Sequence, residues 1–357
     1  MKMTVNALQA KHGDAIVVQI DWDTHKVFRM LIDGGPPGRV AKSGHPALKK
    51  HQAALTNVLD EFLAAGLSFD LTVLTHIDSD HIGGLLVAYT REEYRCVLGP
   101  NVWFNSLRLI SNELKTALPE DSENIINFIL GRETSVKQGI AFDDLLHQHQ
   151  ADRRSVIAGQ QVVYEWGTID ILSPTVDQLR DLAKTWVKKA SEKKTSSTEN
   201  DYAKKMEDLQ KEDEFEADTS VTNASSIALL IRSDAGAALL LGDSLSQTIC
   251  ESLRALGFDE TNRLFVNVCK LSHHGSKGNT CSELLSITEV ENFIISTNGT
   301  NQLPDKQTLG RILKHCPKSK IAFNYPDLIE KIFKPYPEEL RALEHFFVEQ
   351  IEPISSK

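Results

Sequence analysis

One short loop of the chain concentrates residue types that bind metal ions. Residues 75–84 read THIDSDHIGG, which places His76, Asp78, Asp80 and His81 within six residues. Imidazole nitrogens and carboxylate oxygens are ligands of divalent metals, and alternate side chains of an extended loop converge on one side. Because the loop directly follows a short stretch that is typical of a buried strand, the pattern predicts a metal site rather than a solvated turn.

Two later segments carry further candidate ligands. Asp243 ends the apolar run LLLGD, where a carboxylate is tolerated if it is paired or bound to a metal. His273 and His274 follow the apolar run 266–271. Since neighbouring side chains of an extended segment point to opposite sides, we expect only one of these two histidines to be a metal ligand.

Together these segments resemble the metallo-β-lactamase superfamily. The loop is similar to its His-x-His-x-Asp-His signature, in the His-x-Asp-x-Asp-His form that is typical of the metallo-hydrolase domain of DNA-uptake competence channel proteins and their free-standing relatives. The other matching segments follow in chain order and are HGDA at 12–15, LIDGG at 31–35, NASS at 223–226, LLLGD at 239–243 and KLSHHGS at 270–276. The resemblance covers roughly residues 1–300.

The resemblance implies a four-layer αββα sandwich, like that of the metallo-β-lactamases, which holds two divalent metal ions. The implied metal ligands are His76, Asp78, Asp80, His81, Asp243 and His274. His76 and Asp78 would bind one ion, and Asp80 and His81 the other. Asp243 would bridge the two ions, and His274 would complete the second site. Asp80 and His274 are in addition expected to be catalytic.

Several neighbours of this set have open roles. His273 would either support a ligand from behind or be a ligand of altered geometry. Asp14 and Asp33 would either act from behind the ligands or cap turns. Lys277 and Asn279 could contact a phosphate, although a solvated loop is the favoured interpretation.

The sequence departs from the common signature in its ligands. Asp78 stands where the signature has a second histidine, and this exchange shifts the preference from Zn²⁺ toward Mn²⁺, Mg²⁺ or iron. We therefore expect Mn²⁺, with Zn²⁺ or iron as alternatives. No isolated histidine in a matching context occurs between His81 and Asp243, where many members of the superfamily supply another ligand. His147 and His149 are better explained as an exposed helix face.

The composition is that of a globular protein, and we expect a single domain over residues 1–357. The five cysteines are scattered without a Cys-x-x-Cys pair, which predicts no disulfide framework and no thiolate zinc site and favours the cytoplasm. The sequence shows no signal-peptide pattern and no long apolar run, so no membrane association is expected. The formal charge of −10 argues against non-specific binding to a long polyanion, but it does not exclude a local basic groove.

Apolar periodicity predicts two β-rich halves with helices between them, consistent with two packed sheets covered by helices. Strands are expected at 15–22, 28–32, 70–75, 161–166, 168–172, 227–232, 237–241, 266–271 and 292–296. Helices are expected at 48–63 and 248–256, and a helix, a strand and a helix from 306 onward. Residues 191–222 are dense in charge, so we expect a flexible insertion that is a solvated linker or, alternatively, a lid.

These features favour a metal-dependent phosphodiesterase or nuclease in which two metal ions activate a hydroxide. The resemblance implies the substrate class, which is a phosphodiester of DNA, RNA or a nucleotide. The sequence identifies no protein partner. The alternatives are a hydrolase of small esters, lactones or nucleotides and a degenerate, non-catalytic metal-binding scaffold; an iron-based oxidoreductase is disfavoured because no flavin domain follows. Related domains carry a His-Pro where this chain has Leu303-Pro304, so a proton donor expected there lacks its counterpart.

Overall fold

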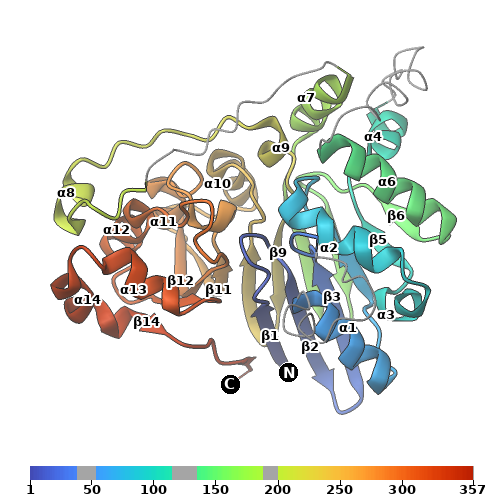
Figure 1. The fold of residues 1–357 in the computed structure, drawn as a ribbon, viewed down its shortest axis with the longest axis horizontal. Helices are drawn as coiled ribbons and strands as arrows, with labels where there is room; N and C mark the ends of the chain where they lie inside the picture. The colour runs from blue at the N-terminus through green and yellow to red at the C-terminus, as the bar shows by residue number, and fades with distance from the viewer. Residues whose placement is uncertain (38–53, 115–134, 188–199, 357) are drawn as a thin grey trace, which may run out of the picture.

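Two β-sheets form the centre of the computed structural model, which describes residues 1–37, 54–114, 135–187 and 200–356. Sheet A has the strand order β15-β1-β2-β3-β4-β5-β6, and sheet B has the order β14-β13-β12-β11-β10-β9-β8-β7. Figure 1 shows both sheets in the middle of the molecule with helices on the two outer sides.

Each sheet combines antiparallel and parallel strands. The antiparallel part of sheet A consists of β1 (Lys2–Ala7), β2 (Ile16–Asp23), β3 (Lys26–Ile32) and β15 (Ile354–Ser355). Its parallel part continues from β3 through β4 (Leu71–Val73), β5 (Asn101–Trp103) and β6 (Asp152–Arg154). The antiparallel part of sheet B consists of β7 (Gln161–Tyr164), β8 (Gly167–Ser173), β9 (Ala228–Ser233) and β10 (Gly236–Leu240). Its parallel part continues from β10 through β11 (Leu264–Lys270), β12 (Thr288–Ile295), β13 (Lys320–Phe323) and β14 (Phe347–Val348).

Helices cover the outer face of each sheet. Those on sheet A are α1 (Ala54–Ala65), α2 (Ser79–Tyr89), α3 (Arg95–Leu98), α4 (Leu107–Leu114), α6 (Ser135–Gln148) and α7 (Val176–Val187). Those on sheet B are α10 (Ser246–Ala255), α11 (Ser282–Ile287), α12 (Lys306–His315), α13 (Asp327–Phe333) and α14 (Pro337–Leu343). The short helices α8 (Met206–Lys211) and α9 (Val221–Ala224) lie between α7 and β9 in the chain.

Strand β10 explains why the fold has four layers. Ala238 and Leu240 point into the core between the two sheets, whereas Ala237 and Leu239 point into the core beneath the helices of sheet B. A third core joins sheet A to its own helices. A strand that is buried on both faces needs a nearly continuous apolar run, which is what the sequence has here. The predicted αββα sandwich is therefore confirmed.

Six of the predicted strands are confirmed and pair as the hairpins β2–β3, β7–β8 and β9–β10. The predicted helix 48–63 is observed from Ala54, and residues 48–53 lie outside the described part. Strands β1, β5 and β6 were not predicted, because β5 and β6 are only three residues long and β1 is weakly apolar. Within the described ranges, no helix combines the length and the hydropathy that a membrane crossing requires.

The stretch predicted as a flexible insertion is described from residue 200 onward. Residues 200–220, which we call the strap, carry helix α8, which lies beside α12, and then run toward α9. Asp213 pairs with the buried guanidinium of Arg311 at 2.7 Å, and Asp201 accepts hydrogen bonds from the first two backbone amides of α12, both at 2.8 Å. The strap is therefore anchored to α12 at these two residues, and residues 191–199 of the predicted insertion lie outside the described part.

Candidate metal centre

The loop after β4 supplies the first group of candidate ligands. It leads from the end of the strand through His76 to Asp78, the residue before α2, and the first turn of α2 holds Asp80 and His81. Helix α2 can start close to the Asp33-Gly34 loop because Gly84 has no side chain. A Cβ atom at this position would lie only 1.9 Å from the carbonyl oxygen of Gly34. Carboxylates at a helix N-terminus are also favoured by its exposed amide groups.

Sheet B supplies the second group. Asp243 follows the end of β10 after Gly242, whose φ of 50° and close approach to Ser226 exclude a larger residue. The Ser226 hydroxyl accepts a hydrogen bond from the Asp243 amide at 2.9 Å. His273 and His274 lie in a short turn after β11 and both have left-handed backbone angles, with φ of 46° and 55°.

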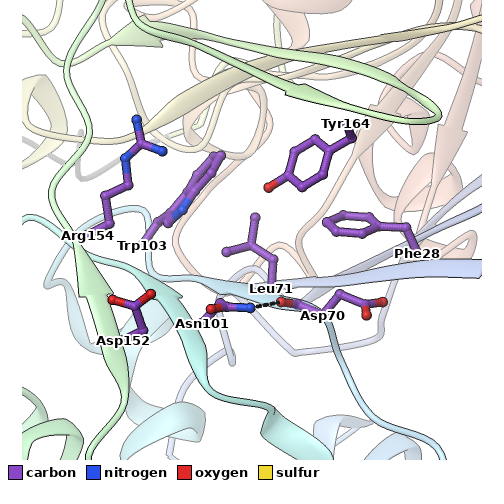
Figure 2. A pocket seen from close by; sticks show the side chains of 8 residues that line it. All are labelled: Phe28, Asp70, Leu71, Asn101, Trp103, Asp152, Arg154 and Tyr164. Atoms are coloured by element: carbon purple, nitrogen blue, oxygen red, sulfur yellow. Dashed lines mark hydrogen bonds between the residues drawn. The ribbon is translucent and has the colours of Figure 1, made fainter.

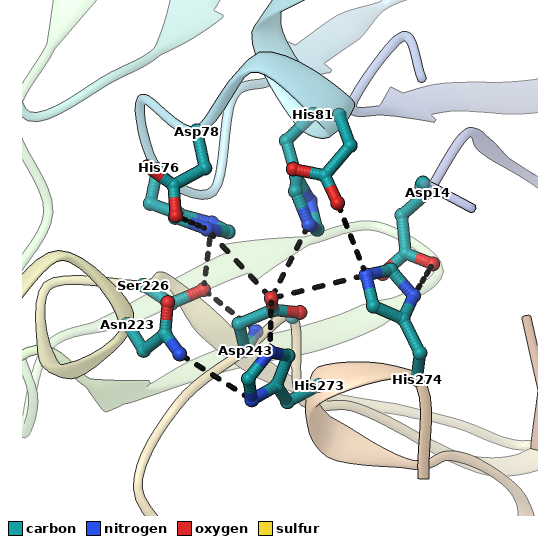
Figure 3. Close-up of polar contacts among 12 residues, drawn as sticks. Asp14, His76, Asp78, His81, Asn223, Ser226, Asp243, His273 and His274 are labelled. Carbon is teal, nitrogen blue, oxygen red and sulfur yellow. Dashed lines mark hydrogen bonds and ion pairs between the residues drawn. The ribbon is translucent and has the colours of Figure 1, made fainter. Parts of the chain in front are cut away.

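The backbone of this turn differs from the extended conformation that the prediction for the two histidines assumed. The expectation that only one of the two histidines is a ligand assumed an extended backbone, in which adjacent side chains point apart. The left-handed turn instead brings both imidazoles toward Asp243, as Figure 3 shows. The Nε2 atoms of His273 and His274 lie 4.0 and 3.9 Å from Oδ2 of Asp243.

A single carboxylate oxygen lies among four imidazoles (Figure 3). Oδ2 of Asp243 is 3.4 Å from Nε2 of His81 and 3.8 Å from Nε2 of His76, in addition to the two contacts above. These separations are too long for good hydrogen bonds. They suit donors that share a metal ion, because atoms about 2.1 Å from one ion lie roughly 3–4 Å apart.

The hydrogen bonds behind the imidazoles direct their lone pairs inward. Nδ1 of His81 donates to Asp33 at 2.8 Å, and Nδ1 of His274 donates to the backbone carbonyl of Ser296 at 2.7 Å. The Nε2 atoms of His76, His81 and His274 are buried and have no hydrogen-bond partner. A buried nitrogen without a partner costs about 1–3 kcal/mol, which a metal ion would offset. The donors therefore fit divalent metal ions.

The donors form two groups around Asp243. The Asp80 side consists of Asp80, His81 and His274, whose donor atoms lie within 4.8 Å of one another. The Asp78 side consists of His76 and Asp78, whose Nε2 and Oδ2 atoms lie 3.7 Å apart. His273 contacts the shared Asp243. All six predicted ligands are thus brought together.

Buried charges lie directly behind these donors. Asp33 accepts hydrogen bonds from the backbone amide and the hydroxyl of Thr75, both at 2.7 Å, and from His81. Asp14 pairs with Lys270, and its Oδ1 lies 3.4 Å from Nδ1 of His274. Of the two roles predicted for Asp14 and Asp33, the structure therefore supports action from behind the ligands.

Sequence reasoning missed Lys270. Its ammonium is completely buried, donates to Asp14 and to the carbonyl of Gly242 at 3.0 Å, and lies 4.0 Å from Oδ1 of Asp243. A signal was present in the sequence, because a lysine that ends an apolar run is rarely buried without a partner.

The charges of the centre hold one another in ionised form. Burial raises the pKa of Asp243, but the imidazoles of His81 and His274 outweigh burial and hold that pKa well below its usual range. Burial opposes protonation of His274, yet the carboxylates of Asp14 and Asp243 raise its pKa to about 10. The pKa values of His81 and His273 are raised in the same way by neighbouring carboxylates, so a metal ion that binds beside these three imidazoles must displace protons.

Other candidates lie elsewhere. His147 and His149 are on α6, where His147 is exposed and Nε2 of His149 lies 2.8 Å from the carbonyl oxygen of Tyr89. Neither belongs to the donor groups found in the described ranges. Asn279 is completely buried, so the expectation of a solvated loop is wrong for this residue. Lys277 is exposed, as expected for a solvated loop, and its backbone amide donates to Asp305.

A cavity of about 470 Å³ lies at the opposite end of the strands, since Leu71, which lines it, begins β4 whereas the metal loop follows the end of that strand. Figure 2 shows the indole of Trp103 beside Arg154 on one side of the cavity and the rings of Phe28 and Tyr164 on the other. Its remaining lining residues are Asp70, Asn101 and Asp152. The cavity is therefore separate from the metal-donor groups.

Comparison with protein-family models and with curated proteins gave no match. Among solved structures, the chain is similar to the metallo-beta-lactamase fold protein YhfI from Bacillus subtilis, with 11% identity over 94% of each chain and a TM-score of 0.36. It is also similar to a protein of unknown function from Enterococcus faecalis V583, with 12% identity over 76% of this chain and 50% of the other, and a TM-score of 0.32. Similarity at this level does not bear on activity.

Proposed function

We propose that this protein is a metal-dependent hydrolase that uses two divalent ions, as in the metallo-β-lactamase superfamily that its sequence resembles. The observation that carries the proposal is the set of buried imidazole Nε2 atoms that surround one oxygen of Asp243 without a hydrogen-bond partner. Uncompensated buried polar atoms are rare in folded proteins, and their convergence on one point indicates a missing cation.

The charge of the site supports two ions rather than one. With neutral imidazoles, the centre contains one ammonium, that of Lys270, and five carboxylates, those of Asp14, Asp33, Asp78, Asp80 and Asp243. The excess of four negative charges matches two divalent cations. A single ion would leave two negative charges uncompensated in a largely buried site, which is unfavourable.

We propose a phosphodiester as the substrate, of DNA, RNA or a nucleotide. Ions held by these donors would supply Lewis acidity toward a phosphoryl oxygen and would lower the pKa of water toward neutral. The carboxylates of Asp78 and Asp80 support this substrate class, because oxygen-rich sites favour the hard ions that suit phosphoryl transfer. The partial exposure of these two side chains, 36% and 21%, gives a substrate access from their side.

The residues of the chain have separate tasks in this proposal. Asp80 and His274, whose donor atoms lie 3.6 Å apart, are the proposed catalytic pair, because they hold the reacting centre on its more enclosed side. Lys270 keeps Asp14 ionised behind them and lies beside Asp243. Asp33 fixes the orientation of His81.

The test is a metal analysis combined with a substrate screen. Metal-free protein is loaded with Mn²⁺ and assayed on bis(4-nitrophenyl) phosphate, single-stranded DNA, RNA and a cyclic dinucleotide, with a lactone and a simple ester in parallel. Uptake of about two ions per chain and turnover of a phosphodiester are expected. Turnover of the ester or lactone alone would favour the small-molecule alternative, and a protein that takes up no ion would be a scaffold.

A further inference from the structure

The imidazole of His273 is held in the way that metal-binding histidines are held. Its Nδ1 lies 3.0 Å from Oδ1 of Asn279 and 3.5 Å from Oδ2 of Asp218. Nδ2 of Asn223 also lies 3.4 Å from this Nδ1, but it donates to Asp218 at the shorter distance of 2.7 Å. Because the nearest neighbour of Nδ1, Oδ1 of Asn279, is an acceptor, we assign the proton to Nδ1, and the lone pair of Nε2 then faces Asp243. The amide orientation of Asn279 follows from its surroundings, because its Nδ2 lies 3.0 Å from Asp218 and 3.3 Å from the carbonyl oxygens of both Asp243 and Ser244.

The other three imidazoles of the centre show the same arrangement. Nδ1 of His81 donates to Asp33, and Nδ1 of His274 donates to the carbonyl of Ser296. Nδ1 of His76 lies 3.1 Å from the hydroxyl of Thr75, which gives its own proton to Asp33 and therefore accepts from the imidazole. An outward Nδ1–H with an acceptor and an inward Nε2 is the usual state of a metal-bound histidine.

The backbone of the turn gives a second, independent observation. His273 and His274 are consecutive residues in the left-handed region, which costs roughly 1–2 kcal/mol for each non-glycine residue. Such outliers persist where the surrounding structure demands them, often at functional sites. In a relaxed extended backbone His273 would point away from His274. The strained turn thus brings the imidazole of His273, in addition to that of His274, to the centre.

The Asp78 side needs a further donor. His81 belongs to one donor group with His76 and Asp243 and to another with Asp80 and His274. When His81 serves the Asp80 side, that side has a carboxylate and two imidazoles in addition to the shared Asp243, and the Asp78 side keeps His76 and Asp78. Many members of the resembled superfamily supply a histidine here from between the signature loop and the bridging aspartate, and this chain has no histidine in a matching context there. The Nε2 atom of His273, 4.0 Å from the shared oxygen, is a donor of the required kind.

We propose that His273 is a metal ligand on the Asp78 side and that the strap orients it through Asp218. The proposal rests on the two-ion function above. Asp218 is itself fixed, since it accepts a hydrogen bond from Asn223 at 2.7 Å. Arg311 joins the strap to the turn, because it pairs with Asp213 and donates to the carbonyl of Thr280, next to Asn279, at 2.8 Å. The charged segment is thereby part of the metal centre.

The test uses His273→Asn, since asparagine tolerates the left-handed conformation and cannot replace the imidazole at the ion. Metal-free protein is titrated with Co²⁺ by calorimetry, the bound metal is counted after desalting, and the exchangeable imidazole N–H signals shifted by the metal are recorded by proton NMR. Asp218→Asn is the positioning variant, and His147→Ala, on the exposed face of α6, is the matched control.

Wild type and His147→Ala are expected to take up two ions per chain. In His273→Asn the Asp80 side should keep its ion, while affinity on the Asp78 side falls by at least about 100-fold and one shifted N–H signal disappears. Asp218→Asn should keep every shifted signal, with that of His273 displaced, and should weaken the same ion by about 10–100-fold.

Two outcomes would overturn the proposal, and they differ. If His273→Asn binds both ions with unchanged affinity and keeps all signals while its turnover falls, His273 contacts substrate and is not a ligand. If wild type takes up one ion or none, the two-ion function itself fails, and the ligand assignment fails with it.

Discussion

The two sides of the metal centre use similar donors in different surroundings. On the Asp80 side, the side chains of His81 and His274 are almost fully buried, and buried carboxylates support both. Asp80 is 21% exposed. On the Asp78 side, the side chain of His76 is buried but that of Asp78 is 36% exposed, and the side chain of His273, which we propose as a ligand there, is 31% exposed. Burial of a charged donor is tolerable only when a cation or a partner compensates it. We therefore expect the enclosed side to hold an ion more tightly than the open side.

The largest effect is expected where the two sides meet. Asp243→Ala removes the oxygen that both sides share, so uptake of both ions should fail and phosphodiester turnover should drop by at least about 10³-fold. Metal content and turnover are measured together after circular dichroism has shown that the variant is folded. Asp152→Ala, in the cavity at the other end of the strands, is the matched carboxylate control and should retain both ions and full turnover. A folded Asp243→Ala protein with full metal and full activity contradicts the account.

The second effect concerns the buried ammonium behind the Asp80 side. Lys270→Met keeps the length of the side chain but leaves the buried carboxylate of Asp14 without its cation, and we expect a loss of about 3–5 kcal/mol in the free energy of unfolding. Denaturant unfolding measures this. The exposed Lys314→Met on α12 should change stability by less than about 0.5 kcal/mol. Equal effects of the two substitutions would show that Lys270 has no such role.

The sequence predicted most of the centre because its ligands follow apolar strands at short, regular spacing. It could not predict that His273 points inward, because that depends on a left-handed turn that two histidines do not ordinarily adopt. The fold was predictable where strands are long and apolar, as in β10, and not where three-residue strands such as β5 and β6 depend on their neighbours.

The strap shows a different limit of sequence reasoning. A charged composition predicts a solvated chain when its charges face water, but Asp213 pairs with the buried Arg311, 98 residues away in the sequence. Composition carries no information about a partner at that distance. Likewise, nothing local distinguishes Asp218 from the other acidic residues of the segment, and only its contact with His273 does so.

A third prediction concerns pH and distinguishes the metal-free from the metal-loaded protein. The pKa of His274 is raised to about 10 by carboxylates, so its charged form stabilises the metal-free fold below the unfolded value of about 6.5. That stabilisation is lost as pH rises from about 6.5 toward 10, and the melting temperature of the metal-free protein should fall over this window. Bound ions replace the protons, so the loaded protein should change much less. Parallel slopes for the two forms, followed by calorimetry, would contradict the ion-pair description.

The smallest effect concerns the choice of metal on the open side. Because Asp78 adds a hard oxygen donor, we expect the wild-type protein to turn over substrate several-fold faster with Mn²⁺ than with Zn²⁺ at matched metal occupancy. Asp78→His restores an imidazole and should reduce or reverse this preference. Kinetic assays on metal-stripped protein decide the question, and faster turnover of wild type with Zn²⁺ would count against a specific role for Asp78.

The central claim is that two ions flank Asp243, and anomalous diffraction from crystals grown with Mn²⁺ tests it most directly. The account predicts two anomalous peaks on either side of Oδ2 of Asp243, one beside Asp80, His81 and His274 and the other beside His76, Asp78 and His273. A single peak, or peaks only at distant carboxylates such as Asp70 and Asp152, would contradict it.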